Sequence, residues 1–387
     1  MFGELLNHIE NEEHKLLRET VRKFVREKIA PIASKIDETD QFPKEIFKEI
    51  SELGFTGILI PETYGGLGED LVSACIVLEE IAKESPSIAL SLLAHSVLCA
   101  HPITRFGNKE QKEKFLPKLA KGEIIGALAI TEPEAGSDAA SIKTVALETE
   151  GGFKISGSKT FITNGSIADL IILYAKTSPD KGKEGISALI FETNTEGFSV
   201  SKKFEKMGMR GSPTASLFFD NAYCPKENLL GEKDKGFSIL VKCLEVERIT
   251  IASISLGIAM SALEWQIRYS RERKQFNKFL YEFQMISEKI AENTAKLEVL
   301  RTYLYFLAKN YNFSKDNRIE SATIKLLASE LGVKSSLDAI QILGGYGYTK
   351  EYPAERYLRD AKLMEIGAGT SEIMKYIIST VMIEKFI

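Results

Sequence analysis

Hydrophobic positions along the chain follow a helical period at both ends and a strand period in between. From about residue 4 to 120, apolar residues recur at steps of three or four. Between about 126 and 235 they alternate with polar residues, as in GGFKISGSKTFITNG and DLIILYAKT, and glycine, asparagine, aspartate or proline bounds each run. After Gly236 the helical period returns and holds nearly to Ile387.

This order of periods predicts a mainly α protein with a central β-domain. We expect a helical domain over residues 1–125, an antiparallel β-domain over 126–235 and a helical bundle over 236–387. Near the start of the first domain, Leu16 and Val21 are predicted to share one buried stripe. The segment IPETYGGLGED is predicted to be a loop between helices, because glycine and proline interrupt the helical pattern.

Composition narrows the class of protein. The chain has 387 residues, of which 44% are apolar, enough for two or three packed domains. Its formal charge is only −4, and Lys and Arg are scattered among Asp and Glu, so we expect no nucleic acid partner. The four cysteines form no CxxC pair, which indicates buried free thiols in a reducing compartment.

No segment of the sequence indicates a membrane or a metal site. We expect no apolar run long enough to span a bilayer, and the opening MFGELLNHIENEEHKLLRET carries acidic residues that a transit or signal peptide avoids. A cytoplasmic protein without membrane insertion is therefore predicted. The sequence has no HExxH, no nucleophile elbow and no GxGxxG after a strand, so we predict no metal and no Rossmann nicotinamide site.

One carboxylate interrupts an apolar helical stripe. Glu247 follows Leu240 and Leu244 and precedes Ile251 at steps of three or four, which places it within the stripe. No Lys or Arg three or four residues away can pair with it, and burial without a partner raises a carboxyl pKa toward neutrality. Such a group suits a general base for a weakly acidic C–H bond, so Glu247 is the first candidate for chemistry.

Two other interpretations of Glu247 stay open from periodicity alone. An arginine from another helix could neutralise the carboxylate, or solvent could reach the stripe at that point. From periodicity alone, these interpretations have at least as much support as a catalytic role. Glu245 lies off the stripe, three residues before Arg248, and is expected to be a solvated surface charge.

Two long segments resemble the signature regions of one enzyme family. AITEPEAGSDAAS at residues 129–141 and QILGGYGYTKEYPAERYLRD at residues 341–360 are similar to the two signatures of acyl-CoA dehydrogenases. IPETYGGLG, GSKTFITNG, KMGMRGS, RKQF and GAGTSEI also stand where that family places them, so the resemblance covers nearly the whole chain. It implies an N-terminal helical domain, a middle β-domain and a C-terminal four-helix bundle.

The resemblance also implies an FAD site between the β-domain and the bundle. The residues implied on the flavin side, with Thr131 and Thr163 as hydrogen-bonding side chains, are Leu128, Ile130, Thr131, Gly136, Ser137, Phe161, Ile162, Thr163, Thr370 and Glu372. The residues implied to reach the FAD of a neighbouring subunit are Arg273, Phe276, Gln284, Gln341, Ile342, Gly344 and Gly345. Arg273 suits an anionic pyrophosphate, and a shared site of this kind implies a homotetramer.

The usual base of the family is missing. Most members carry it in a YEGT segment, where this chain has Gly367, Ala368, Gly369 and Thr370. A minority, including isovaleryl-CoA and long-chain dehydrogenases, carries it on the LEVER helix, at the position of Glu247. The resemblance therefore implies that Glu247 is the base and that the Ala368 N–H, with a flavin ribityl hydroxyl, stabilises the thioester oxygen.

The implied reaction is α,β-dehydrogenation of an acyl-CoA to a trans-2-enoyl-CoA. Glu247 would remove the α-proton while the β-hydrogen leaves as hydride to FAD, and electron-transferring flavoprotein would reoxidise the flavin. The residues implied as thioester or CoA contacts are Ser137, Ser238, Arg248, Gly367 and Gly369.

The substrate is expected to be a short branched acyl chain. Gly367 replaces a frequent tyrosine and leaves space for a branch, and AHSVLC also resembles the isovaleryl-CoA dehydrogenases. A long-chain substrate stays open, because long-chain enzymes share the displaced glutamate. An oxidase or monooxygenase, or a non-catalytic flavoprotein or binding module, are the alternatives on the same fold.

Overall fold

The first part of the chain forms helices whose buried faces follow the 3.6-residue period. The computed structural model describes residue 6 and residues 8–386. Val21 is buried, but Leu16 is 66% exposed, so the predicted stripe is wrong at Leu16. Five residues turn a helix by about 140°, which puts these two side chains on different faces. The α-helices here are α1 (Glu12–Phe24), α2 (Ala33–Thr39), α3 (Lys44–Glu52), α4 (Leu71–Ala82), α5 (Pro86–Leu93), α6 (His101–Phe106) and α7 (Lys109–Ala120).

The middle part of the chain folds into an eight-stranded sheet in the order β6-β7-β3-β2-β4-β5-β8, with β1 beside β4. Most neighbours are antiparallel, as predicted for this domain, while β1 and β2 each pair with β4 in parallel. The chain leaves β1, forms the β2–β3 hairpin and returns alongside β1 in the same direction. The strands are β1 (Gly126–Ala129), β2 (Val145–Thr149), β3 (Gly152–Thr163), β4 (Leu170–Lys176), β5 (Ile186–Glu192), β6 (Phe198–Val200), β7 (Thr214–Pro225) and β8 (Leu229–Leu230).

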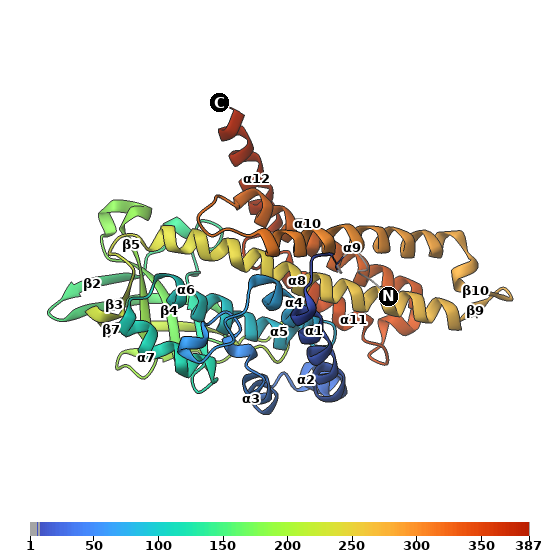
Figure 1. Ribbon diagram of the computed structural model, residues 1–387, viewed down its shortest axis with the longest axis horizontal. Coiled ribbons are helices and arrows are strands. Elements are labelled where there is room, and N and C mark those ends of the chain that lie inside the picture. The colour runs from blue at the N-terminus through green and yellow to red at the C-terminus, as the bar shows by residue number, and fades with distance from the viewer. Residues whose placement is uncertain (1–5, 7, 387) are drawn as a thin grey trace.

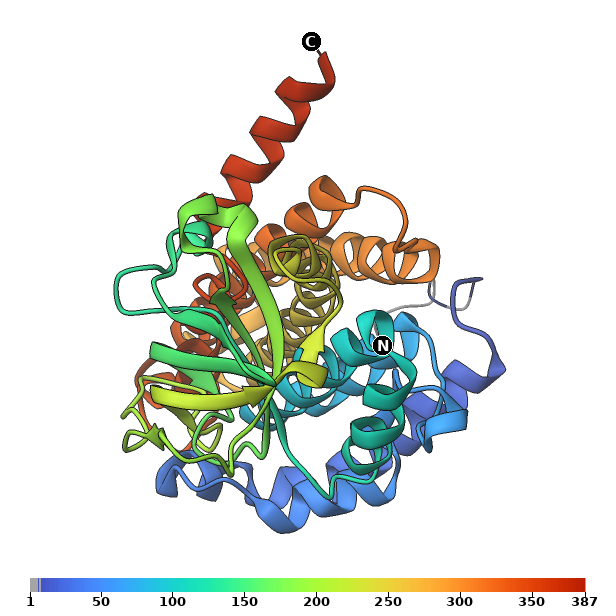
Figure 2. The same ribbon diagram turned by 90° about the vertical axis from the view of Figure 1, so that its left-hand side faces the viewer.

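The last part of the chain is a helical bundle built around α8. This helix runs along the molecule from the sheet to the β9–β10 hairpin at the opposite end (Figure 1), and it packs against α4, α9, α10 and α11. By contrast, α12 extends away from the body (Figures 1 and 2). The elements of this part are α8 (Gly236–Glu272), β9 (Lys274–Gln275), β10 (Lys278–Phe279), α9 (Gln284–Asn310), α10 (Arg318–Leu343), α11 (Ala354–Met364) and α12 (Ser371–Phe386).

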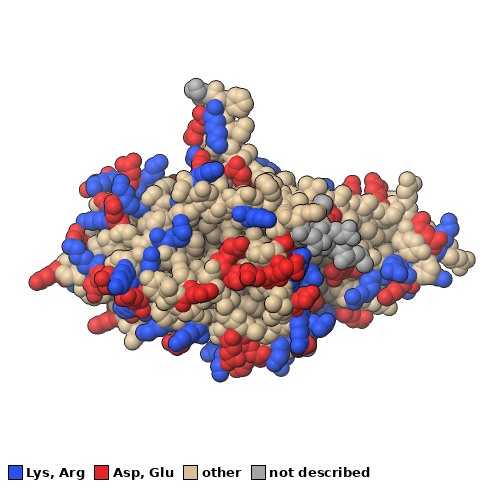
Figure 3. All heavy atoms as spheres, in the orientation of Figure 1, with Lys and Arg blue, Asp and Glu red and all other residues tan. Residues whose placement is uncertain are grey.

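Two helical segments are long and apolar enough to cross a membrane by length and composition. They are Pro86–Phe106 and Gly236–Glu272, so the expectation that no apolar run reaches this length is wrong. Within the structure, 89% and 100% of their apolar windows are buried, as in core helices of a folded protein. The four cysteines are buried and free, as predicted, and the face drawn in Figure 3 mixes basic and acidic side chains.

A buried ionic cluster fixes α4, which packs directly against α8. Glu79 on α4 is fully buried and accepts hydrogen bonds from Arg18 on α1 at 2.7 Å and from Arg301 on α9 at 2.6 Å. The Tyr305 hydroxyl donates to the same carboxylate at 2.7 Å. Charge-assisted bonds of this kind hold helices from both ends of the sequence in one arrangement around α8.

Candidate active site

Glu247 lies on α8 with its carboxylate inside the protein. The residue is 8% exposed and forms no hydrogen bond or ion pair from its side chain within the described part of the chain. Burial raises the pKa of Glu247 to about 7, and the positive charges of Arg248 and Lys325 oppose this rise without cancelling it. The interpretation in which an arginine neutralises Glu247 by direct pairing is therefore not what the structure shows.

Glu245 is not the surface charge that its position in the sequence predicts. It is 1% exposed and lies within hydrogen-bond reach of three groups, Lys242 Nζ, the Tyr311 hydroxyl and Asn317 Nδ2, each at 3.3 Å. The segment between α9 and α10 supplies two of these groups and covers this face of α8. Because Tyr311 in this segment is 66 residues from Glu245 along the chain, the helical period around Glu245 cannot predict that the segment covers it.

The turn at Gly367 to Thr370 packs against the Glu247 face of α8. A Cβ on Gly367 would lie 3.6 Å from the Leu363 carbonyl oxygen and 4.0 Å from Ile251, one helical turn after Glu247, both ordinary contact distances. Ala368 has φ +56° and Gly369 has φ +96°, so the turn uses the left-handed region. Within the described residues, the Ala368 N–H donates no hydrogen bond to the protein, which leaves it available to a bound group.

Two cations hold the carbonyl groups of this turn. Arg248 Nε on α8 lies 3.5 Å from the Ala368 carbonyl oxygen, and Lys325 Nζ on α10 donates to the Gly369 carbonyl at 2.6 Å. Both side chains are buried. The structure thus brings Gly367, Ala368 and Gly369 together with Arg248, next to the face of α8 that carries Glu247.

The end of β1 brings two of the residues implied on the flavin side close to α8. Leu128 and Ile130 pack against an apolar cluster that includes Leu240 and Cys243 of α8. The Thr160 N–H donates to the Thr131 carbonyl at 2.8 Å, so β3 fixes the segment that follows β1.

Phe161 at the end of β3 presents an aromatic ring to the outside of the sheet. It is 66% exposed, has φ +57°, and its ring lies 5.1 Å from that of Phe204. Its neighbour Ile162 is buried in the β-domain core, so only the backbone of Ile162 can face a cofactor. Thr163 beside it is half-buried.

The remaining residues implied on this side have simpler surroundings. Gly136, Ser137 and Glu372 are exposed, and Thr370 Oγ accepts a hydrogen bond from the Ile373 N–H at the start of α12. Ser238 is exposed in the first turn of α8, where its hydroxyl donates to the Lys235 carbonyl at 2.7 Å.

A second group of implied residues lies at the far end of α8. An open pocket of about 490 Å³ is lined there by Arg273, Ile342, Gly344 and Gly345 among others. Phe276, Gln284 and Gln341 are exposed at this end of the molecule but are not among its lining residues.

This end of α8 is suited to an anionic group. Arg273 is exposed, and Gly344 has φ +62° with no atom of the described residues within 4 Å of where a Cβ would be, so backbone and guanidinium are both accessible. Asn277, which stands where the family shows glycine, has φ +59°, a conformation that asparagine tolerates better than most residues.

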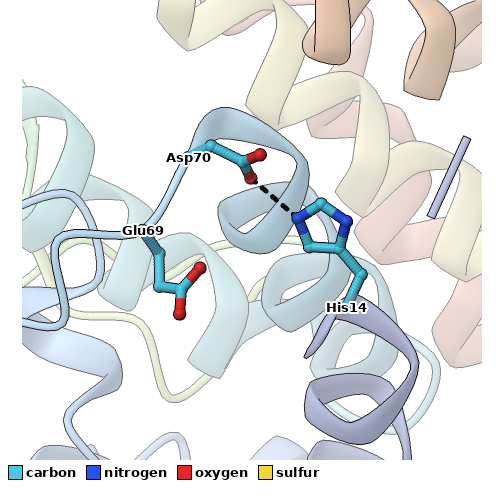
Figure 4. A group of neighbouring side chains, drawn as sticks. All are labelled: His14, Glu69 and Asp70. Atoms are coloured by element: carbon cyan, nitrogen blue, oxygen red, sulfur yellow. Dashed lines mark hydrogen bonds and ion pairs between the residues drawn. The ribbon is translucent and has the colours of Figure 1, made fainter. Parts of the chain in front are cut away.

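One further cluster has the composition of a metal site. Ligand atoms of His14, Glu69 and Asp70 lie within 4.8 Å of one another (Figure 4). The Asn11 N–H donates to His14 Nδ1, so the ring proton lies on Nε2, which donates to Asp70. Asp70 also caps α4 by accepting a hydrogen bond from the Ser73 N–H. Through these bonds the cluster connects the start of α1 to the start of α4.

Two buried polar residues near Glu247 escaped the sequence analysis. Lys325 is fully buried, and the Tyr174 hydroxyl on β4 is buried without a hydrogen-bond partner within the described residues. Both interact electrostatically with Glu247. Lys325 interrupts the apolar run between Ile324 and Leu326, the same signal that singled out Glu247, whereas Tyr174 fits its strand pattern and gives no signal.

The arrangement of the carboxylate and the backbone N–H is suited to one class of enzyme chemistry. A carboxylate with a pKa near neutrality can accept a proton from a weakly acidic carbon, and a free backbone N–H beside it can stabilise the negative charge that develops on a neighbouring oxygen. The combination is suited to proton abstraction next to a carbonyl group.

Comparison with known proteins gives the family. The chain matches "Acyl-CoA dehydrogenase, N-terminal domain" over residues 11–123, the middle domain over 127–222 and the C-terminal domain over 234–383. It is 45% identical over 368 residues to an acyl-CoA dehydrogenase of Bacillus subtilis, covering 95% of this chain and 97% of that protein. It is 44% identical over 366 residues to mitochondrial isovaleryl-CoA dehydrogenase of Solanum tuberosum, covering 94% and 89%.

A solved structure agrees with these matches. Butyryl-CoA dehydrogenase from Megasphaera elsdenii superposes with a TM-score of 0.94 at 39% identity, covering 97% of this chain and 99% of that one. The chain therefore belongs to the acyl-CoA dehydrogenase family, with its fold of N-terminal helical, middle β and C-terminal helical domains.

Proposed function

We propose that the protein catalyses the FAD-dependent α,β-dehydrogenation of a short branched acyl-CoA, with Glu247 as the base. The observation that carries this proposal is the buried Glu247 carboxylate, which has no hydrogen-bond or ion-pair partner among the described residues, on the α8 face that packs against the turn carrying the Ala368 N–H. Its pKa of about 7 keeps a useful fraction ionised near neutral pH, while its basicity exceeds that of an ordinary carboxylate.

FAD is the cofactor of this reaction, and the residues of this chain fit it. On the flavin side, we assign the Thr131 segment, which follows β1, and the end of β3, which carries Thr163 and the exposed Phe161 ring. When bound there, FAD accepts the two electrons and the β-hydrogen that leave the substrate. The polypeptide supplies the base, the oxyanion donor and the alignment of the thioester.

We assign separate roles in the reaction to residues of this chain. Glu247 takes the α-proton, and the Ala368 N–H donates to the thioester oxygen as negative charge develops on it. Arg248 and Gly369 contribute through the turn that carries this N–H, while Gly367 leaves room beside the reacting carbons. Ser137 and Ser238, both exposed, are proposed as contacts to the CoA part.

The distance between the two groups of residues supports a shared cofactor site in a homotetramer. Arg273 follows Glu247 by 26 residues of one continuous helix, which separates their positions by about 39 Å along its axis. One FAD cannot have its isoalloxazine beside Glu247 and its pyrophosphate beside Arg273 of the same chain. We propose that Arg273, Phe276, Gln284 and the Gln341 to Gly345 segment serve the FAD of a neighbouring subunit.

The space beside Gly367 supports a branched substrate. A Cβ at this position would meet its nearest described atoms at 3.6 and 4.0 Å, which is ordinary contact, so no described atom crowds the position at which glycine replaces the larger tyrosine side chain. A long-chain substrate is the second candidate, because the displaced base is shared with long-chain enzymes. We further propose electron-transferring flavoprotein as the electron acceptor.

A cytoplasmic location remains our proposal from the sequence.

Anaerobic reduction of the bound flavin tests the proposed function. The purified yellow protein is mixed with isovaleryl-CoA, butyryl-CoA or palmitoyl-CoA, and the loss of flavin absorbance is followed in a stopped-flow instrument. We expect the fastest reduction with isovaleryl-CoA. Faster reduction with palmitoyl-CoA would favour the long-chain alternative, and no reduction by any of the three would refute the proposal.

A further inference from the structure

Lys325 is an unusual residue to find inside α10. It is fully buried, yet of the three N–H groups on its ammonium only one donates to a described residue, the Gly369 carbonyl at 2.6 Å. An ammonium group loses much of its hydration on burial, so a single hydrogen bond is weak compensation for its position. An apolar side chain between Ile324 and Leu326 would stabilise the packing of α10 more than the buried lysine does.

The one hydrogen bond of Lys325 falls on the turn that carries the Ala368 N–H. Ala368 and Gly369 both have positive φ, and for Ala368 this conformation is strained, so the surroundings must hold it in place. Lys325 from α10 and Arg248 from α8 attach the two successive carbonyl groups of this turn to two different helices. The Ala368 N–H lies in the preceding peptide plane, which the backbone angles of Ala368 relate to the plane that Arg248 holds, so fixing the turn also fixes the direction of this N–H.

Lys325 also faces the acid that starts the proposed reaction. The charged groups that interact with it are Glu247 and Arg248 on α8, Glu365 just after α11, and Glu372 on α12. Burial lowers the pKa of Lys325 to about 8, and the pKa of Glu247 would rise further if the lysine charge were absent.

We propose that Lys325 is a positioning residue of the reaction, which fixes the Ala368–Gly369 turn and places a positive charge beside Glu247. This inference rests on the proposed function, because it assigns Lys325 a role through the base and the oxyanion donor. Lys325 links α10 to both groups that act on the thioester.

The test compares Lys325→Met with Lys334→Met in the FAD-bound protein. Lys334 lies on the same helix and pairs with Asp338 at 2.7 Å, away from the turn, so its variant controls for loss of an ion pair on α10. The readouts are the limiting rate of anaerobic flavin reduction from pH 6 to 9 and the apparent Kd of the acyl-CoA. Misplaced donors at an active site lower rates by on the order of 100-fold.

We expect Lys325→Met to slow flavin reduction about 100-fold, to raise the midpoint of its pH dependence above the wild-type value, and to change the acyl-CoA Kd by less than about tenfold. Lys325→Arg retains the positive charge, so its midpoint should stay close to that of the wild type. Lys334→Met should match the wild type in rate and midpoint.

A second readout separates proton removal from electron transfer. A 3-thia acyl-CoA has sulfur in place of the β-carbon and cannot lose a β-hydrogen, so exchange of its α-hydrogen in D₂O reports Glu247 and the oxyanion donor alone. We expect slow exchange in Lys325→Met and normal exchange in Lys334→Met. If wild type is reduced by acyl-CoA and the FAD-bound Lys325→Met protein retains its rate and midpoint, the inference is refuted while the proposed function stands. If no acyl-CoA reduces the flavin of the wild type, the proposed function itself is refuted, whatever the behaviour of Lys325→Met.

Discussion

Removing the Glu247 carboxylate should make the protein more stable at alkaline pH. Folding raises the pKa of this carboxyl from 4.5 to about 7 because burial disfavours its ionised form. A group with a raised folded-state pKa stabilises the fold fully below its unfolded pKa, and this contribution is lost as the pH rises through the folded pKa. Wild type should therefore lose about 2 to 3 kcal/mol of folding free energy between pH 5 and pH 8 through Glu247 alone.

Glu247→Gln cannot ionise and should escape this loss. For a chain of this length, the advantage of the variant in thermal midpoint should grow by about 3 °C from pH 5 to pH 8. Circular dichroism melts of both FAD-bound proteins at the two pH values measure it. Glu245→Gln is the matched control, because its carboxylate accepts hydrogen bonds from Lys242, Tyr311 and Asn317 and its loss should lower the midpoint at both pH values. A Glu247→Gln advantage that is independent of pH would refute the assignment of a buried, unpaired carboxylate.

Other substitutions follow from the same geometry. Gly367→Tyr should fill the space beside the reacting carbons and lower the ratio of isovaleryl-CoA to butyryl-CoA reduction rates about 10- to 100-fold; an unchanged ratio would refute the role of Gly367 in selecting a branch. Gly369→Ala should cost about 1 to 2 kcal/mol in denaturant unfolding, because φ is +96° and Met374 lies 2.7 Å from the added Cβ, whereas Gly367→Ala should be nearly neutral. His95 accepts from the Gly126 N–H and donates to the Leu119 carbonyl, and burial lowers its pKa to about 4. Its neutral form should therefore contribute stability above pH 6.5 that is lost toward pH 4, and a His95→Gln variant should show a smaller loss over that range in thermal melts.

The parts of the structure that the sequence predicts are those set by local periodicity. Glu247 could be singled out because the residues that bury it, Leu240 and Ile251, lie on its own helix. The order of helical and β regions was predictable for the same reason. Leu16 was assigned to the wrong face because five residues do not complete whole helical turns.

The parts that could not be predicted depend on contacts between distant segments. Glu245 is buried by Tyr311 and Asn317, and the parallel pairing of β1 with β4 depends on where the chain returns after the β2–β3 hairpin. That Glu247 has no direct partner among residues 6 and 8–386 is also a property of the packed helices rather than of α8 alone. Lys325 could have been recognised as a charge within an apolar run, but its hydrogen bond to Gly369 spans 44 residues.

The central claim is that Glu247 removes the proton that starts the reaction. Its most direct test is stopped-flow mixing of FAD-bound Glu247→Gln protein with isovaleryl-CoA under anaerobic conditions, beside wild type. We predict that the variant folds, remains yellow and binds the acyl-CoA, while its flavin absorbance does not decay on the time scale of wild-type reduction. Reduction of the variant flavin at the wild-type rate would contradict the account and require another base.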